Sequence, residues 1–308
     1  MNGSVTKPTG QVDMGDDKAR FETLMQRPKI SWPTIALLFA AFGLFGFSSY
    51  AHIVGTLSLG WAIAFNSVAA YLAFTVVHDA SHSSVSTHRQ LNDWVGRAAM
   101  VLLEPTPIFM AFRTIHMSHH KFTNDPVRDP DFYVGSGPFW LLPLKWATLD
   151  VGYFRFYLNP EMFMKRPKKE RVEFYWGVAF GLCVVAAMAA AGWLTYYFLL
   201  FFIPSRVQKI VLALAFDFLP HYPHAANGRK QPFQATSNRV GMEWLLTPLL
   251  LYQNYHLVHH LYPTLPFYRN LQAWKARQTY HNDQSPALVD AFSLTPKSSD
   301  SQYSQYSQ

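Results

Sequence analysis

Residues 30–78 form a stretch of 49 residues without a single Asp, Glu, Lys or Arg. A helix needs about 20 apolar residues to cross the hydrocarbon core of a bilayer, so this stretch can hold two spans and a turn. A helical hairpin also satisfies its backbone hydrogen bonds internally, as a lipid environment requires. We expect spans near 32–50 and 55–77, joined by a turn near 48–52.

A second charge-free stretch, the 32 residues 174–205, predicts another hairpin with its turn at 191–193. The fourth span is irregular, because Pro204, Arg206 and Lys209 precede the apolar stretch 210–219. Either this helix is broken near Pro204, or its second half leaves the membrane. Only 15% of the chain is charged, against about 25% in a typical soluble domain. The sequence therefore predicts an all-α integral membrane protein with about four transmembrane helices in two hairpins.

The segment between the hairpins, residues 79–172, contains twelve Lys and Arg residues, whereas neither predicted turn contains any. The positive-inside rule then places this segment and both chain ends on the cytoplasmic side, in a membrane such as the bacterial inner membrane. Its short apolar pieces predict interfacial helices, and so a cytoplasmic helical cap. The net charge of +7 fits an anionic leaflet and not nucleic acid, since the basic residues lie beside apolar runs.

The ends of the chain differ in composition from its middle. Residues 1–29 have mixed charge and no apolar helical stripe, so we predict a flexible N-terminal tail, a membrane domain over 30–285 and a disordered C-terminal tail over 286–308. The single cysteine, Cys183, excludes an internal disulfide and a protein-bound iron–sulfur cluster. Electrons for any redox reaction must therefore come from a separate donor.

Eight of the thirteen histidines lie in three short motifs, HDASH from His78, HMSHH from His116 and HLVHH from His256. Residues four apart share a helix face, so both imidazoles of such a pair can reach one metal ion. In each HxxHH the two adjacent histidines diverge by about 100° around the helix axis, so one motif can supply ligands to two metals.

The number of histidines bears on the kind of metal. A lone buried histidine is usually a core residue, but three such motifs in one chain are not explained in that way. Imidazole binds Zn, Cu, Fe and Ni, and a zinc site takes only four ligands. We predict two metal ions with open positions, and iron, because a nearly carboxylate-free set suits a metal that changes oxidation state beside O2. His221 is a further predicted ligand, and Asp217, four residues earlier, binds directly, acts through water or orients a histidine.

Several polar residues near the motifs are candidates for orienting the imidazoles, since a metal-bound histidine usually donates its other N–H to an acid or a carbonyl. They are Asp79, Asp125, Asp129 and Asn254. Asp125 and Asp129 serve equally well as turn residues in the stretch NDPVRDPD. Arg113, three residues before His116, either anchors a fatty-acid carboxylate or faces the lipid headgroups.

HDASH, HMSHH followed by Asn124-Asp125-Pro126, and NYHLVHHLYP resemble the histidine boxes of the membrane fatty-acid desaturase superfamily, over about residues 30–275. Within it, the chain looks most like the β-carotene hydroxylase branch. The resemblance implies a four-helix membrane stalk with a cytoplasmic cap that holds two irons. It implies as ligands His78, His82, His116, His119, His120, His221, His256, His259 and His260. Asp217 replaces an Asn of acyl-CoA desaturases, which implies a contact through water, and His88 would lie just outside the ligands.

These features predict an O2-dependent oxidoreductase that attacks unactivated C–H bonds of a long apolar lipid, with electrons from a donor such as ferredoxin and its reductase. We favour hydroxylation of a β-carotene ring over two alternatives, desaturation of a fatty acid or acyl lipid, and oxidative decarboxylation of a fatty acid to a terminal alkene. The basic run 165–171 faces anionic lipid or docks an acidic donor. A membrane zinc lipid hydrolase is the alternative from another class, and one zinc against two irons would distinguish them.

Overall fold

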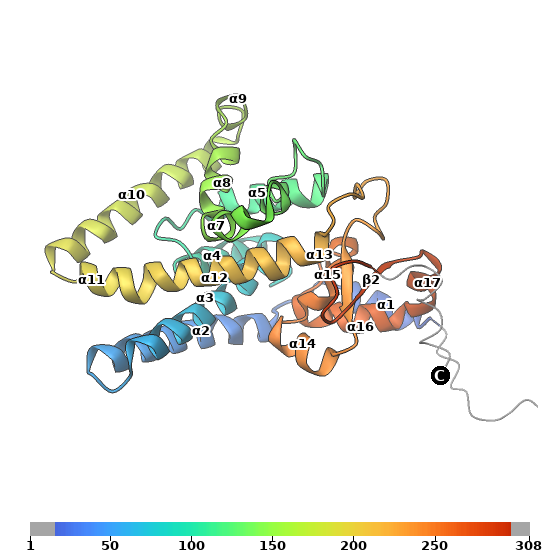
Figure 1. The fold of residues 1–308 in the computed structure, drawn as a ribbon, viewed down its shortest axis with the longest axis horizontal. Helices are drawn as coiled ribbons and strands as arrows, with labels where there is room; N and C mark the ends of the chain where they lie inside the picture. Colours follow the sequence, from blue (N-terminus) through green and yellow to red (C-terminus); the bar gives the residue numbers. More distant parts are fainter. Residues whose placement is uncertain (1–15, 297–308) are drawn as a thin grey trace, which may run out of the picture.

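The computed structural model describes residues 16–296, and most of them are helical. Four helices are long and apolar enough to cross a membrane: α2 (Trp32–Ile53), α3 (Leu59–Ser81), α10 (Lys168–Ala190) and the continuous helical segment Leu194–His221. They form two helical hairpins, with α3 and the segment Leu194–His221 running alongside each other (Figure 1). The predicted all-α membrane fold with four long helices is confirmed.

The first hairpin turns later than predicted, at residues 54–58 instead of 48–52. Ser48 lies within α2, where its hydroxyl donates to the carbonyl oxygen of Leu44 at 2.8 Å and contacts the amide of Asn66 on α3. The small polar residues that suggested a turn thus join the two helices. The chain reverses at Gly55, whose φ of +79° is readily adopted only by glycine.

The fourth span is one continuous helical segment and is not broken near Pro204, the first of the two irregularities expected from its sequence. That its second half leaves the membrane stays a prediction. The span runs through α11 (Leu194–Tyr197), the π-helical η2 (Phe198–Phe202), α12 (Ile203–Leu212), the π-helical η3 (Ala213–Phe218) and α13 (Leu219–His221). The wider π turn immediately before α12 accommodates Pro204, which has no N–H to donate. Arg206 and Lys209 do not end the span, because each is paired with an acid, Asp150 at 2.6 Å and Glu104 at 2.8 Å.

Short helices join and follow the hairpins. Between the hairpins lie α4 (Arg89–Met100), α5 (Phe109–Phe122), α6 (Phe132–Gly135), η1 (Phe139–Leu141), α7 (Leu142–Ala147), α8 (Leu149–Tyr157) and α9 (Pro160–Phe163). After the fourth span come β1 (Ser237–Val240), α14 (Glu243–Leu249), η4 (Gln253–Tyr255), α15 (His256–Leu261), η5 (Phe267–Arg269), α16 (Asn270–Ala276), α17 (Gln278–Asp283) and β2 (Ala287–Asp290). These last elements gather at one end of the long helices (Figure 1).

Both predicted tails contain ordered structure. Residues Lys18–Met25 form α1, which packs on the C-terminal helices, with the rings of Phe21 and Tyr262 5.1 Å apart. Strand β2 pairs in parallel with β1, so the predicted disorder does not begin at residue 286. Neither element has a pattern long enough to be recognised alone, because each depends on a partner distant in sequence. The rest of the two predicted tails, residues 1–15 and 297–308, lies outside the described residues.

Candidate metal centre

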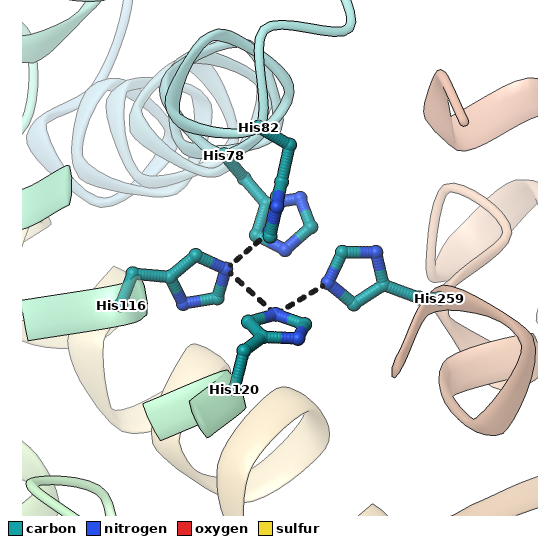
Figure 2. Close-up of side chains that lie close together, drawn as sticks. All are labelled: His78, His82, His116, His120 and His259. Atoms are coloured by element: carbon teal, nitrogen blue, oxygen red, sulfur yellow. Dashed lines mark hydrogen bonds between the residues drawn. The ribbon is translucent and has the colours of Figure 1, made fainter. Parts of the chain in front are cut away.

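The nine predicted ligand histidines come together where the ends of α3 and α13 meet α5 and α15. They form two groups, and within each group the ring nitrogens lie within 4.8 Å of one another. The five-histidine cluster consists of His78, His82, His116, His120 and His259 (Figure 2). The four-histidine cluster consists of His119, His221, His256 and His260. The structure thus groups the histidines as two metals with separate ligand sets would require.

Helix geometry divides each HxxHH motif between the clusters. On α5, His116 and His120 are four residues apart and join the five-histidine cluster, while His119 turns to the other one. On α15 the division is reversed, since His256 and His260 join the four-histidine cluster and His259 crosses to the first. This is the divergence that the spacing predicts for adjacent histidines on a helix.

The ring nitrogens face one another at hydrogen-bond distances, but a neutral imidazole has only one N–H, so hydrogen bonds cannot pair all of the converging nitrogens. In the first cluster Nε2 of His82 lies 2.8 Å from Nε2 of His116, and Nε2 of His120 lies 3.0 Å from Nε2 of His259. Both ring nitrogens of His78 are buried without a hydrogen-bond partner in the described part of the chain. Buried polar atoms are rarely left unpaired. The residues therefore fit a metal ion in each cluster.

The protonation of the imidazoles also suits metal binding. Burial, reinforced by neighbouring histidines, lowers the pKa of His82, His116, His120 and His259 well below the ordinary value. The same causes lower the pKa of His256 and His260 in the other cluster. These side chains are therefore neutral, the form in which imidazole binds a metal.

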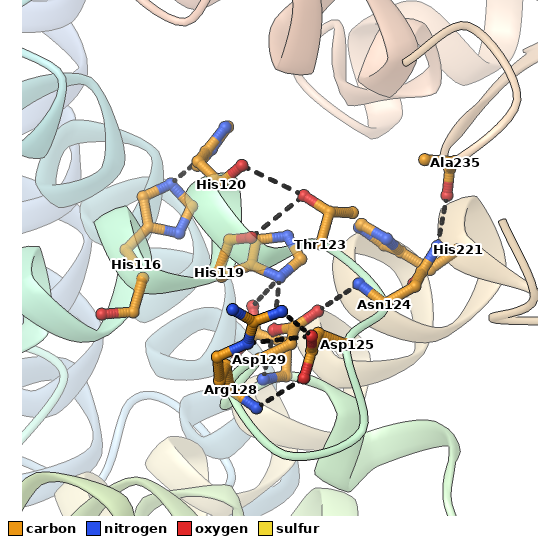
Figure 3. Close-up of polar contacts among 12 residues, drawn as sticks. His116, His119, His120, Thr123, Asn124, Asp125, Arg128, Asp129, His221 and Ala235 are labelled. Atoms are coloured by element: carbon orange, nitrogen blue, oxygen red, sulfur yellow. Dashed lines mark hydrogen bonds and ion pairs between the residues drawn. The ribbon is translucent and has the colours of Figure 1, made fainter. Parts of the chain in front are cut away.

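His119 is the exception, because two acids lie against it. Its Nδ1 lies 2.8 Å from Oδ1 of Asp129 (Figure 3). The same nitrogen lies 3.3 Å from Oδ2 of Asp131. Burial alone would lower the pKa of His119, but the two carboxylates outweigh it and raise this pKa to about 10. Asp129 also accepts the backbone N–H of Asn124 at 2.7 Å. Asp129 thus combines the two roles considered for it, orienting a histidine and closing the turn.

Asp125, Asp79 and Asn254 were predicted to orient imidazoles, but the structure gives them other partners. Asp125 pairs with Arg128 in an exposed turn. Asp79 and Asn254 are buried in contacts between elements, Asp79 accepting from Thr34 of α2 at 2.8 Å and Asn254 donating to a hydroxyl of α14 at 3.2 Å.

Two further predicted residues lie apart from the clusters. His88 is exposed at the N-terminus of α4. Arg113 pairs with Asp93 at 2.7 Å and donates to the carbonyl oxygen of Ala80 at 3.0 Å, while its guanidinium lies over the ring of Phe109. The interpretation of Arg113 as a carboxylate anchor stays a prediction, although this arginine already has an acid as its partner. It joins α5 to α3 and α4, because the acid that neutralises it comes from the chain itself.

Three other polar residues belong to the surroundings of the site. Asp217 lies beside the histidines but is not a member of either cluster. Sequence reasoning missed Tyr153, whose hydroxyl donates to Asp131 at 2.7 Å, and Gln253, whose Oε1 lies 3.3 Å from Nδ1 of His256. The spacing of three residues between Gln253 and His256 on one helical segment was a usable signal, whereas the distant Tyr153 had none.

Two adjacent cavities lead to the histidines. A small one, of about 30 Å³, is lined by histidines of both clusters and by Asp217. A larger one, of about 80 Å³, is lined mainly by apolar side chains of α5, α8 and α12. The two share five lining residues, Phe74, Phe112, Leu149, Tyr153 and Leu212. An apolar chain lying in the larger cavity would therefore point toward the histidine clusters.

Comparison with known proteins gives a consistent result. Residues 48–286 match the family model for fatty acid desaturase. The chain is similar to dihydrorhizobitoxine desaturase of Bradyrhizobium elkanii, with 28% identity over 66% of this chain and 63% of that protein. It is also similar to the omega-3 fatty acid desaturase fat-1 of Caenorhabditis elegans, with 25% identity over 76% of this chain and 61% of the other. A β-carotene ketolase of Paracoccus sp. is 28% identical over 64% of this chain and 71% of its own length. The chain spans about three fifths of the length of the two desaturases.

Proposed function

The chain belongs to the fatty acid desaturase family, and from this premise we propose that it is a membrane oxidoreductase that uses two histidine-bound irons and O2 to oxidise an unactivated C–H bond of a long apolar lipid. One observation supports the proposal above all others. Two buried clusters of histidines, five and four in number, lie at the end of an apolar cavity.

The residues of the chain have separable roles in this proposal. The two clusters would hold the irons, which supply the activation of O2 when bound. Asp129 holds the Nδ1 side of His119, so that its Nε2 faces the four-histidine cluster. Phe74 and Phe112 line both cavities, and they exclude water and position the apolar chain. The protein thus contributes geometry and a dry site.

The similar proteins support two candidate reactions. The β-carotene ketolases favour oxidation of a carotenoid ring, and we retain ring hydroxylation as the first candidate. The two desaturases favour desaturation of an acyl chain as the second. Both reactions attack an unactivated C–H bond, so one metal centre suits either. Oxidative decarboxylation has less support, because Arg113 is already paired with Asp93.

Metal analysis combined with product analysis tests the proposal. Protein purified from membranes should contain two irons per chain and consume O2 with a reductant and a lipid. Expression in a host that makes β-carotene, followed by analysis of carotenoids, acyl lipids and headspace hydrocarbons, would identify the product. The variant His259→Ala should make none. One zinc per chain and a hydrolysed lipid would instead indicate a membrane lipid hydrolase.

We also propose an external donor of the ferredoxin type, docking on exposed lysines that precede or begin α10. Lys165, Lys168 and Lys169 are exposed, whereas Arg166 lies over the ring of Tyr157. Complementary charge speeds the encounter of such partners. Reversing the three lysines to Glu should slow turnover with the natural donor but not with a chemical reductant, at unchanged iron content. Reversal of the exposed Lys230 and Lys275 is the matched control, and equal rates in both variants would reject the docking site.

The side of the membrane on which the clusters lie is a further part of the proposal. The basic segment 79–172 and the uncharged hairpin turns favour the cytoplasmic side for the histidines and both chain ends. A periplasmic reporter inserted in the turn at 54–58 should be active, and the same reporter after residue 296 should be inactive. The reverse pattern would overturn this topology.

A further inference from the structure

The larger apolar cavity has a polar region away from the histidines. Glu104, Asp150, Gln208 and Lys209 line it there, and of these four none lines the smaller cavity beside the clusters. Gln208 lies four residues before Leu212, which both cavities share, and further from His221 along the fourth span. A lipid that fills the cavity therefore meets apolar walls toward the histidines and polar groups at its remote end.

The charges of this polar region balance one another. The ammonium of Lys209 binds Glu104 at 2.8 Å and the hydroxyl of Ser205 at 2.6 Å, and the carbonyl oxygen of Leu103 lies at 3.4 Å. Asp150 is paired with both terminal nitrogens of Arg206, at 2.9 and 2.6 Å. Two cations thus face two anions. A carboxylate brought here would be an additional, uncompensated charge away from water, which is costly.

Gln208 differs from its charged neighbours because it has bonding capacity to spare. Its side chain is only 3% exposed, and its Oε1 has no hydrogen-bond partner within residues 16–296. An amide offers both an acceptor and donors, so it matches a hydroxyl group, which can donate and accept. A buried polar atom without a partner in a ligand cavity is satisfied when the ligand supplies one.

We propose that the substrate is an apolar chain bearing a hydroxyl group at its remote end, and that Gln208 binds this hydroxyl. The inference rests on the proposed function, since it assumes that the other end of the chain is oxidised at the histidine clusters. Gln208 and His221 are 13 positions apart, roughly 20 Å along a helix. This separation suits a long lipid, such as a fatty alcohol or a carotenoid already hydroxylated on one ring.

Substrates of matched length test the proposal on the iron-loaded protein. Binding is measured by thermal shift and turnover by product analysis, for hexadecanol, hexadecanoate and hexadecane, and separately for β-carotene and its singly ring-hydroxylated derivative. Hexadecanol should bind and react roughly 3- to 10-fold better than hexadecane, as one hydrogen bond between neutral groups allows. A stronger preference for hexadecanol over hexadecane would identify a fatty alcohol as the substrate. A stronger preference for the singly hydroxylated carotenoid over β-carotene would identify a carotenoid.

Three variants make the test specific. Gln208→Leu should lose the roughly 3- to 10-fold preference for hexadecanol, while its binding and turnover of hexadecane stay as in the wild type. Val207→Leu, at a position that is 39% exposed, is the matched control and should keep the preference. Glu104→Gln leaves Lys209 without its anion, so this variant should gain binding of hexadecanoate.

The possible failures are distinguishable. The inference would be overturned if the wild type bound and oxidised hexadecanol no better than hexadecane, and the hydroxylated carotenoid no better than β-carotene. An unchanged preference in Gln208→Leu would overturn it as well, even if C–H bonds are oxidised. Selective binding of the hydroxylated lipids by a protein that oxidises none of them would support the role of Gln208 and reject the proposed function.

Discussion

Nδ1 of His119 lies 2.8 Å from Oδ1 of Asp129, and this contact sets the direction of the opposite ring nitrogen. His119 is one position from His120 in the sequence, yet the two belong to different clusters. The carboxylate holds the His119 ring in the orientation that serves the four-histidine cluster. An acid in this position also makes the imidazole a better metal ligand.

Replacing Asp129 by Asn should therefore weaken the four-histidine cluster. The amide keeps the shape and an acceptor atom but removes one of the two charges that raise the pKa of His119 to about 10. We expect a loss of roughly 10- to 100-fold in metal affinity or turnover, as is typical for partners of metal ligands. Competition with a chelator measures the affinity. Asp125→Asn, in the exposed turn nearby, is the control, and equal metal retention by both variants would contradict the assignment.

Neighbouring histidines should have different effects on metal content. His120→Ala leaves four of the five histidines in its cluster (5 − 1), whereas His119→Ala leaves three of four (4 − 1). We expect His120→Ala to retain close to two irons per chain and His119→Ala to fall toward one, while both lose turnover. Metal analysis of the purified variants gives the stoichiometry. His88→Ala, at an exposed position, should resemble the wild type, and identical losses in the two ligand variants would argue against two separate sites.

The features that were predictable from the sequence are those set by local geometry. The 49-residue stretch without charge gives the first hairpin, and the spacing within HxxHH gives the division of His119 and His120 between clusters. The features that were missed depend on partners distant in sequence. Asp79 binds Thr34, which is 45 residues away, and Arg113 is neutralised by an acid on another helix. The π turn before Pro204 depends on backbone geometry that the residue types of this segment do not predict.

Gly181 should be intolerant of a side chain, because α10 lies against the loop that precedes α5. A Cβ at position 181 would lie 2.6 Å from the carbonyl oxygen of Pro105, and backbone cannot move aside cheaply. We expect Gly181→Ala to lower the free energy of unfolding by about 1–3 kcal/mol. Gly43→Ala on α2, where nothing lies within 4 Å, should be neutral or should stabilise by up to about 1 kcal/mol. Thermal unfolding in detergent compares the two variants. An unchanged stability of Gly181→Ala would mean that α10 does not pack closely on the loop that contains Pro105.

His281 should make the stability of the protein depend on pH. Its ring is buried and stacked on Trp274, with 4.7 Å between ring centroids, and its Nε2 accepts from the hydroxyl of Tyr262 at 2.9 Å. Burial, with a smaller contribution from Arg277, lowers the pKa of His281 to about 4, although the hydrogen bond to the carbonyl oxygen of Trp274 and the charge of Asp16 oppose this. Protonation of Nε2 would also remove the acceptor that Tyr262 uses.

The sign of the effect follows from the two pKa values of His281, about 4 in the folded chain and about 6.5 in the unfolded chain. Because the folded state favours the neutral ring, the contribution of His281 to the free energy of unfolding is complete above about pH 6.5. This contribution decreases as the pH falls toward 4, by at most about 3 kcal/mol. The wild-type melting temperature should therefore fall between about pH 7 and about pH 5 more steeply than that of His281→Gln, which has no group to protonate there. His88→Gln should keep the wild-type slope, because residue 88 is exposed. Parallel curves for the wild type and His281→Gln would show that His281 is not kept neutral by the fold.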